Sequence, residues 1–355
     1  MRVGILSYPM LFQRDGGLQV QVRATMAALQ ALQLPALQLE LVDPNCQRID
    51  SFDVIHVFSA INGNYRLVEL ASEQGVPVVL SALVSPGWDK RTAWRANMAE
   101  RLAGRLTQWQ VQTSYAQTRR ALQLAEIVVA LGEPEKKSLI EGFKVAPSRI
   151  RVLPNGIAEH FFHADPAAFR RHTGLDGPFV LMVGAISPYK NQRGLVRAMA
   201  QLDLPVVLIG HAQRQHHAYL KQLLNSPRVR WLGQLAHHDP LLASAYAAAS
   251  VLALPSQGEV YPLAVLEALA AGTPVVMTDE SALSLPSGDF ALKQLAWNDG
   301  AAMRDAVSGL IAAPPSREAV RSLVKALTWQ RVALGIADCY QQLYARRKPE
   351  AADAV

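Results

Sequence analysis

The chain has 355 residues, of which 50% are hydrophobic and 18% are charged. This composition excludes a disordered chain and suits a globular protein with two cores, since one core serves about 100–200 residues. The net charge of +6 favours anionic partners, namely nucleic acid, phosphorylated substrates or acidic lipids, but a mildly basic enzyme surface without such a partner explains it equally well.

The first half of the chain alternates short apolar runs with amphipathic segments. Strands are predicted at 2–8, 52–59, 76–84, 125–131 and 150–156, and helical segments at 18–32, 65–74 and 92–124. Because these strands are rich in Val, Ile and Leu throughout, they indicate a parallel sheet covered on both faces. Residues 1–160 are therefore predicted to form a Rossmann-like α/β domain.

A second alternation follows residues 160–178, a polar stretch with Pro and Gly that predicts a linker or domain boundary. Strands are predicted at 179–186, 204–210, 229–233, 251–255 and 274–278, and helices at 190–202, 217–225, 240–249 and 263–271. Residues 161–327 thus predict a second doubly wound, Rossmann-like domain. Residues 328–346 predict an amphipathic helix that packs back on the first domain, and the tail from residue 348 is predicted to be disordered.

The carboxyl ends of the strands are where ligands bind in such sheets, and two facing domains enclose a cleft between those ends. The predicted strand 251–255 leads to Glu259 in a loop, and Pro262 suits the first turn of a helix that carries Glu267. The two carboxylates can accept hydrogen bonds from two hydroxyl-bearing groups of one ligand, such as the two sugars of a nucleotide sugar. Glu267 is costly in an otherwise apolar helix unless it is paired or ligand-bound, and a buried structural carboxylate is the alternative.

The stretch VGAISPYKN has the features of a phosphate site. Ser187 can cap a helix that starts at Pro188 and presents free N–H groups, and Lys190 adds a positive charge. The alternative is that Lys190 is only a solvated helix residue. Gly16 and Gly17 follow the first strand, where glycine lets the backbone approach a ligand, although such a pair is often only a turn.

Six stretches carry a resemblance to a known family: DGGLQVQV, PNGI, VGAISPYKN, VRWLGQL, PSQGEVYPLAVLEALAAGTPVV and LTWQRVA. Together they resemble the retaining glycosyltransferases of family 4, whose GT-B fold consists of two facing Rossmann-like domains with an interdomain cleft. The resemblance extends over nearly the whole chain. The fifth stretch, with the spacing E-x7-E, is highly specific, and the others are individually weak.

The resemblance implies a role for each site residue. By position, Glu259 contacts hydroxyls of the donor sugar, Glu267 binds the ribose of its nucleotide, and Lys190 neutralises the diphosphate leaving group. Glu259 and Lys190 are the catalytic residues that it implies. The implied donor-binding residues are Gly16, Gly17, Gly184, Ser187, Lys190, Glu259, Val260, Tyr261, Leu263 and Glu267.

Two departures from the family pattern leave other functions open. Ala185 stands where relatives often carry Arg, and the stretch VLSALVSPGW lacks the His that many relatives place near the donor sugar. These departures keep a catalytically degenerate nucleotide-sugar binding protein as one alternative. A nucleotide-sugar epimerase on the same fold is another, although the block around Glu259 argues against it.

Metal and cofactor sites are not predicted. The histidine pairs at 216–217 and 237–238 consist of adjacent residues that point apart, so we interpret them as surface histidines. No D-x-D triplet is present to hold a metal-bound diphosphate. The reaction is therefore expected to need no metal and no cofactor, the donor being a UDP- or GDP-sugar.

Residues 88–120 form a basic segment in which Arg recurs with helical spacing beside Trp94 and Trp109. Such a helix can lie on an anionic membrane surface, and an ordinary amphipathic cover helix is an equal alternative. Nucleic acid is not an expected partner, because no basic and aromatic reading motif appears.

The predicted function is transfer of a hexose-type sugar to a glycan or lipid-linked acceptor in surface polysaccharide or lipopolysaccharide biosynthesis. Cys46 and Cys339 lie far apart and suggest neither a disulfide framework nor a zinc site, which fits a reducing compartment. No signal peptide or membrane-spanning run is recognised, so a cytoplasmic location is expected, with the inner face of the cytoplasmic membrane left open.

Overall fold

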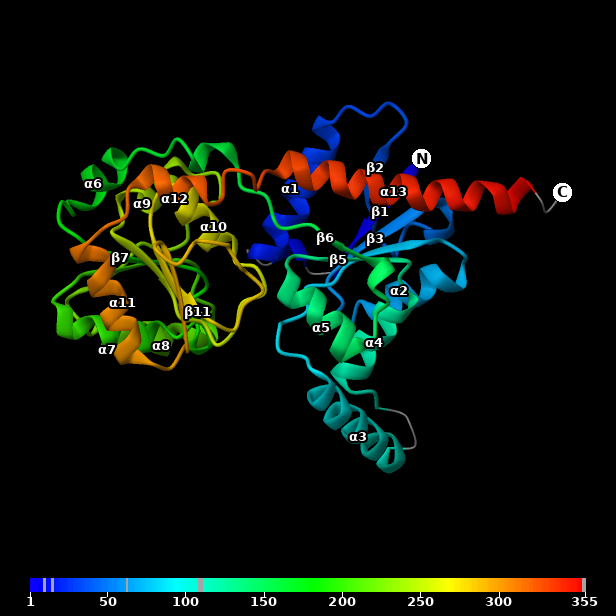
Figure 1. Cartoon of the computed structure of the whole chain (residues 1–355), viewed down its shortest axis with the longest axis horizontal. Helices are drawn as coiled ribbons and strands as arrows, with labels where there is room; N and C mark the ends of the chain where they lie inside the picture. The colour runs from blue at the N-terminus through cyan, green and yellow to red at the C-terminus, as the bar shows by residue number, and fades with distance from the viewer. Residues whose placement is uncertain (9–10, 14–15, 62, 108–110, 353–355) are drawn as a thin grey trace. The chain divides into compact units, whose positions relative to one another are not determined.

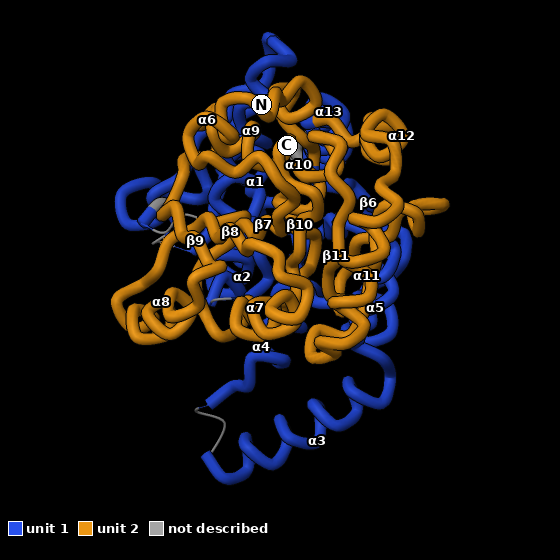
Figure 2. The backbone as a smooth tube through the Cα atoms, turned by 90° about the vertical axis from the view of Figure 1, so that its left-hand side faces the viewer, with its two compact units in different colours: residues 1–14, 18–155, 329–355 blue, residues 15–17, 156–328 orange. Residues whose placement is uncertain are grey.

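The computed structural model describes residues 1–8, 11–13, 16–61, 63–107 and 111–352. The chain folds into two compact units, coloured separately in Figure 2. One unit consists of residues 1–14, 18–155 and 329–355, and the other of residues 15–17 and 156–328. The main boundary lies between Asn155 and Gly156, slightly before the position expected from the sequence.

The first unit is built on a six-stranded parallel sheet with the order β2-β1-β3-β4-β5-β6. Its strands are β1 (Arg2–Leu6), β2 (Gln38–Leu41), β3 (Val54–Phe58), β4 (Val78–Ser81), β5 (Ile127–Ala130) and β6 (Ile150–Val152). Its helices are α1 (Gly17–Ala31), α2 (Tyr65–Glu73), α3 (Lys90–Leu106), α4 (Ser114–Leu124), α5 (Glu133–Phe143) and α13 (Trp329–Ala352).

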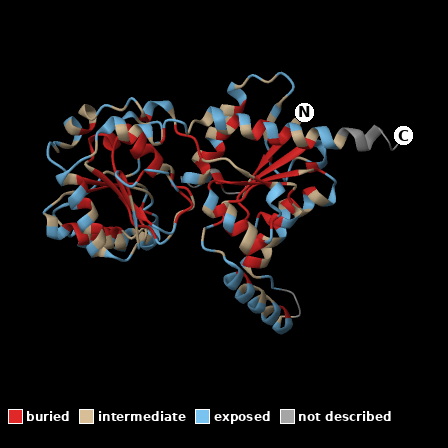
Figure 3. Ribbon diagram, viewed as in Figure 1, coloured by how far each residue is buried: buried red, intermediate tan, exposed pale blue. Residues whose placement is uncertain are grey.

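Two hydrophobic clusters cover the two faces of this sheet. One cluster joins the sheet to α2, α4 and α5, and the other joins it to α1 and α13. Figure 3 shows the strands buried between helices whose outer surfaces are exposed. Strands buried on both faces are what the continuous apolar runs predicted.

The second unit holds another six-stranded parallel sheet, with the order β12-β11-β10-β7-β8-β9. Its strands are β7 (Val180–Val183), β8 (Val206–Ile209), β9 (Val229–Trp231), β10 (Val251–Leu254), β11 (Val275–Thr278) and β12 (Leu292–Leu295). Its helices are α6 (Ala167–Thr173), α7 (Gln192–Met199), α8 (His217–Leu224), α9 (Pro240–Ala248), α10 (Leu263–Ala270), α11 (Gly300–Ala312) and α12 (Arg317–Ser322). Figure 1 shows α7 and α11 on one face of this sheet and α9, α10 and α12 on the other.

The edge strands β2 and β12 were not predicted. Their sequences, QLEL and LKQL, mix polar and apolar residues and are only partly buried. An edge strand needs no continuous apolar run, because one side of its backbone lacks a neighbouring strand and its side chains remain partly solvated. The predicted helical segment 92–124 is also divided, into α3 and α4.

The segment 160–178 is packed into the second unit, so its interpretation as a linker was wrong. Phe161 and Phe169 are fully buried, and Phe169 stacks on Phe179 of the second core with ring centroids 5.4 Å apart. The backbone N–H of Phe169 donates to Ser244 Oγ at 2.8 Å. Because the segment is mostly polar, its sequence did not indicate that these two aromatic residues are buried. They hold the short helices of the segment against α9 and α10.

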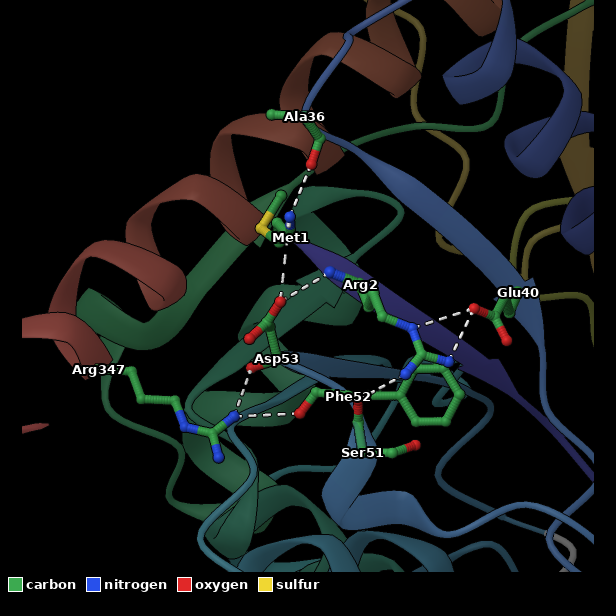
Figure 4. Close-up of polar contacts among 8 residues, drawn as sticks. All are labelled: Met1, Arg2, Ala36, Glu40, Ser51, Phe52, Asp53 and Arg347. Atoms are coloured by element: carbon green, nitrogen blue, oxygen red, sulfur yellow. Dashed lines mark hydrogen bonds and ion pairs between the residues drawn. The ribbon is translucent and has the colours of Figure 1, made fainter.

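Helix α13 belongs to the first unit, although it follows the second unit in sequence. Its buried residues include Ala333, Ile336 and Tyr340, and near its end Arg347 donates to the carbonyl oxygens of Phe52 and Asp53 at 3.0 and 3.3 Å (Figure 4). The helix continues to Ala352, so the disordered tail predicted from residue 348 is wrong for 348–352. Residues 353–355 lie outside the described part of the chain.

Arg2 completes this polar cluster at the start of β1. Its guanidinium donates to Glu40 Oε1 at 3.0 and 3.2 Å and to the carbonyl oxygen of Ser51 at 3.1 Å, and it lies over the Phe52 ring (Figure 4). The cluster therefore links β2, the turn before β3 and the end of α13 around one strand.

His56 connects α13 to the centre of the first sheet. Its Nδ1 lies 2.7 Å from Tyr340 Oη, and its Nε2 lies 2.9 Å from Ser81 Oγ. The imidazole is completely buried, and this burial lowers the pKa of His56 from 6.5 to about 3. The ring is therefore neutral in the folded protein at ordinary pH.

Acidification is expected to destabilise the chain through His56. Because the folded pKa is about 3 and the unfolded value is 6.5, the stabilisation is complete above pH 6.5 and is lost as the pH falls toward 3. At pH 5 the loss amounts to about 2 kcal/mol. Urea unfolding of the wild type and of His56→Gln at pH 7 and pH 5 measures it, with the exposed His172→Gln as a control. An equal pH dependence in His56→Gln and the wild type would contradict this assignment.

Candidate functional site

Three loops meet at the carboxyl end of the second sheet, after the neighbouring strands β7, β10 and β11. Backbone hydrogen bonds join them: Gln257 N–H to Tyr189 O at 2.9 Å, Glu259 N–H to Glu280 O at 2.9 Å, and Ala282 N–H to Val260 O at 2.8 Å. The loop that carries Glu259 is thus fixed on both sides. This is the edge of a parallel sheet at which ligands are expected to bind.

Lys190 and Glu259, the two predicted catalytic residues, form an ion pair in which Lys190 Nζ donates to Glu259 Oε1. Lys190 ends a short 3-10 helix (Pro188–Lys190) after β7, and Glu259 follows β10. Their side chains are 22% and 14% exposed, so both groups reach the surface of the site. The structure therefore places a cation and a carboxylate side by side at this edge of the sheet.

Tyr189 supports this pair and was not predicted. Its hydroxyl donates to the Gly258 carbonyl oxygen at 2.8 Å. Burial, together with the charges of Glu259 and Glu280, raises the pKa of Tyr189, so the phenol remains protonated and keeps donating at neutral pH. The residue precedes Lys190 in the motif SPYKN, but nothing in the sequence indicated which way its ring points.

The phosphate-site prediction at Ser187 needs a correction. The Ser187 side chain makes no capping hydrogen bond to the 3-10 helix that begins at Pro188. Asn191 instead caps α7, its side chain accepting from Gly194 N–H at 3.2 Å. The buried Gln192 side chain donates to Ala185 O at 2.9 Å and accepts from Ser187 N–H at 3.4 Å. Residues of α7 therefore hold this loop in place. The capped helix that was expected to start at Pro188 starts instead at Gln192.

Gly184 and Gly210 approach each other where β7 and β8 end. A Cβ atom on Gly210 would lie 2.0 Å from the Gly184 carbonyl oxygen, and the φ angle of Gly210 is +149°. A Cβ on Gly184 would lie 3.7 Å from Cε of Lys190. Glycine at these two positions lets the loop after β7 pack against the next strand end beside the lysine.

Glu267 lies in α10 and is only 5% exposed. Tyr246 Oη donates to its Oε2 at 2.8 Å, and His237 Nε2 lies 2.7 Å from its Oε1. These contacts offset the cost of burying a carboxylate in an apolar helix, which keeps the structural interpretation of Glu267 open beside the ribose-binding one. Burial, with the adjacent charge of Glu267, raises the pKa of Tyr246 far above its usual value.

His237 was interpreted as a surface histidine, and that interpretation was wrong. Its side chain is 31% exposed, and its ring packs edge-on against Phe161 with centroids 5.4 Å apart. No sequence spacing connects the loop after β9 with α10. Across 16–61, 63–107 and 111–352 and the shorter described stretches, no group of three or more His, Cys, Asp or Glu could hold a metal. Whether the reaction needs a metal stays a prediction.

The remaining predicted residues lie around this centre or before α1. Val260 and Tyr261 continue the Glu259 loop, and Leu263 begins α10. Burial raises the pKa of Tyr261 to about 12. Gly16 and Gly17 are exposed at the start of α1, where an added Cβ would meet no protein atom within 4 Å. Contacts within the protein therefore do not require glycine there, and the role of this pair stays a prediction.

Two family profiles match the chain. The profile described as Glycosyltransferase Family 4 matches residues 30–161, and the profile described as Glycosyl transferases group 1 matches residues 167–284. The second match contains the loops of Lys190 and Glu259 together with Glu267. Each profile therefore corresponds to most of one of the two units.

Curated relatives include D-inositol 3-phosphate glycosyltransferases. The protein from Kineococcus radiotolerans is 33% identical over 175 residues, which are 44% of this chain and 40% of that protein. The protein from Frankia alni is 31% identical over 238 residues, which are 60% of this chain and 58% of that protein. The matches thus span about 40–58% of the length of these relatives.

Solved structures resemble the whole chain. Sucrose-phosphate synthase from Thermosynechococcus elongatus has a TM-score of 0.73 and 20% identity, with 97% of this chain and 99% of that chain covered. HepE from Anabaena, in complex with UDP, has a TM-score of 0.69 and 17% identity, with 96% and 100% covered. WaaG, a glycosyltransferase involved in lipopolysaccharide biosynthesis, has a TM-score of 0.67 and 17% identity, with 96% and 99% covered.

The two parallel sheets, their flanking helices and these structural neighbours define a two-domain α/β protein with the GT-B fold, as the sequence predicted. Together with the two profile matches, they show that the chain belongs to the family 4-like glycosyltransferases.

Replacing Gly210 is expected to disrupt the loop after β7. The change Gly210→Ala places a Cβ against the Gly184 backbone, and backbone atoms cannot move aside as the end of a flexible side chain can. The melting temperature should therefore fall by roughly 4–8 °C, equivalent to about 2 kcal/mol. Gly177→Ala, where a Cβ meets nothing within 4 Å, is the matched control. Differential scanning calorimetry of the three proteins measures the shift, and equal melting temperatures would contradict the close approach.

Proposed function

We propose that the chain is a retaining, metal-independent glycosyltransferase that moves a hexose-type sugar from a UDP- or GDP-sugar to a glycan or lipid-linked acceptor. Surface polysaccharide or lipopolysaccharide biosynthesis is the pathway class that we propose for it. The observation that carries the proposal is the pairing of Lys190 with Glu259 at the carboxyl end of a parallel sheet.

The pair has the charges that donor chemistry needs. A diphosphate bound by Lys190 would place the departing charge next to a cation, and the adjoining donor sugar would then reach the Glu259 carboxylate with its hydroxyls. Tyr189 and the loop after β11 hold Glu259 in place for this role. The leaving diphosphate could itself take the proton of the acceptor hydroxyl, which would allow displacement on the face that retains configuration.

Relatives support the class of donor. Structures of Anabaena HepE contain UDP, UDP with glucose, and UDP-glucose. The curated relatives act on D-inositol 3-phosphate, and WaaG is involved in lipopolysaccharide biosynthesis. The net charge of +6 suits a phosphorylated or lipid-linked acceptor of either kind.

A nucleotide-sugar binding protein without turnover is the second candidate. It is favoured by Ala185, which offers no cation after β7, and by the absence of His from the stretch 79–88, which begins within β4. A nucleotide-sugar epimerase on the same fold is a third, and the block of sequence around Glu259 argues against it.

Release of nucleoside diphosphate from a panel of UDP- and GDP-sugars should reveal one preferred donor. Glu259→Ala and Lys190→Ala are each expected to lower that release about 10²–10³-fold, since each removes a charge aimed at the reacting groups. Glu318→Ala, which changes an exposed carboxylate on α12, is the matched control. Donor binding without release from any sugar would favour the binding protein instead.

Helix α3 supports a membrane-bound acceptor. Trp94, Met98, Leu102 and Leu106 recur every fourth residue, and their exposed fractions are 64%, 47%, 61% and 76%. On the opposite face, Ala93 and Gly104 are buried. Figure 1 shows α3 extending away from the sheet of its own unit. Trp109, the other predicted aromatic residue, lies outside the described residues.

Arginines share the exposed half of this helix with the apolar row. They are Arg91, Arg95, Arg101 and Arg105, all exposed. This combination suits an anionic membrane surface. The apolar side chains can enter the acyl region of the bilayer, and the guanidinium groups can bind lipid phosphates. No helix within the described residues is long and apolar enough to cross a membrane. We therefore propose peripheral attachment on the cytoplasmic side.

Flotation with liposomes of acidic lipid should carry the wild type to the top of the gradient. Changing the four α3 arginines to Glu should reduce the floated fraction at least about tenfold, because each basic residue contributes about 1 kcal/mol at an acidic surface. The charge-matched control changes four exposed lysines elsewhere to Glu: Lys137, Lys144, Lys221 and Lys325. Equal flotation of the α3 variant and the control would contradict attachment through α3.

A further inference from the structure

The Glu267 carboxylate is held by two donors that come from different elements. Tyr246 projects from α9 and reaches Oε2 at 2.8 Å, whereas His237 projects from the loop after β9 and reaches Oε1 at 2.7 Å. Tyr246 is fully buried, and His237 is 31% exposed. The carboxylate is therefore fixed from the protein interior on one oxygen and from the edge of the site on the other.

Phe161 aligns both donors. Its ring lies edge-on to His237 with centroids 5.4 Å apart and edge-on to Tyr246 with centroids 5.7 Å apart. Phe161 is completely buried in the segment that follows the domain boundary. His160 adds a second ring contact to His237, with centroids 6.2 Å apart. The packing leaves His237 little freedom to turn away from Glu267.

The hydrogen-bonding capacity of Glu267 is only half used by these contacts. An ionised carboxylate offers about four acceptor positions, two on each oxygen. Tyr246 and His237 take one position on each oxygen, which leaves one on each. Two acceptor positions on neighbouring oxygens match the two adjacent hydroxyls of a ribose.

We propose that His237 is a positioning residue for ribose recognition: it orients the Glu267 carboxylate so that its remaining acceptor positions receive the ribose hydroxyls of the donor nucleotide. This inference rests on the proposed function, because it assumes that Glu267 meets a nucleotide. It extends that function by assigning to His237 the preference for ribonucleotides over 2′-deoxyribonucleotides.

The test compares nucleotides that differ in one hydroxyl. Calorimetric dissociation constants are measured for UDP and 2′-deoxy-UDP, and for GDP and 2′-deoxy-GDP, with the full chain. The wild type should bind the deoxy form of its preferred nucleotide about tenfold more weakly, because one hydrogen bond to a carboxylate is lost.

His237→Leu should weaken binding of the ribonucleotide about tenfold and binding of the deoxynucleotide less, because the deoxynucleotide has only its 3′-hydroxyl contact to lose, so that the discrimination falls. His237→Gln, which retains an N–H donor, should restore part of it. His238→Leu, a change of the exposed neighbour, should keep the wild-type ratio. Loss of structure would weaken both nucleotides alike, so the ratio separates positioning from a general structural effect.

The outcomes separate this inference from the proposed function. If Glu267→Gln abolishes the discrimination and His237→Leu preserves it, the role of His237 is overturned and donor binding by Glu267 stands. If His237→Leu weakens both nucleotides equally, His237 is structural and the inference fails. If Glu267→Gln changes nothing, the inference fails and the proposed site at Lys190 and Glu259 stands. If neither UDP nor GDP binds the wild type, the proposed donor site and the inference fail together.

Discussion

Parallel strands bring their carboxyl ends to one edge of a sheet, and this constraint places the candidate site. In the second unit, β7, β10 and β11 are neighbours, so the loops that follow them meet although they are far apart in sequence. Lys190 and Glu259 come together because each stands shortly after one of these strands. The backbone hydrogen bonds between the loops then hold the two side chains at contact distance.

Buried charge is the second constraint on the site. A buried carboxylate in an apolar helix is unfavourable unless it accepts hydrogen bonds, and Glu267 accepts them from Tyr246 and His237. The same contacts that satisfy the carboxylate also orient it. Phe161, which contacts both donors, extends this support to the segment after the domain boundary.

The sequence predicted the central strands well, because a strand covered on both faces must be apolar along its whole length. It failed at β2 and β12, whose side chains are partly solvated and whose pattern is mixed. It also failed at 160–178, where a few buried aromatic rings outweigh a polar composition. These two edge strands and this short packed segment depend on neighbours that are distant in the chain, and their own local pattern did not report them.

For the site, the sequence alone determined the residues that lie close together along the chain: the spacing of Glu259 and Glu267, and the position of Lys190 after an apolar strand. The regular geometry of a strand, loop and helix is enough for such predictions. Only the tertiary structure decided that Lys190 pairs with Glu259, that Tyr189 supports them, and that His237 reaches Glu267. These contacts join loops and a helix that follow separate strands, and their geometry follows from the order of strands in the sheet, which local sequence does not encode.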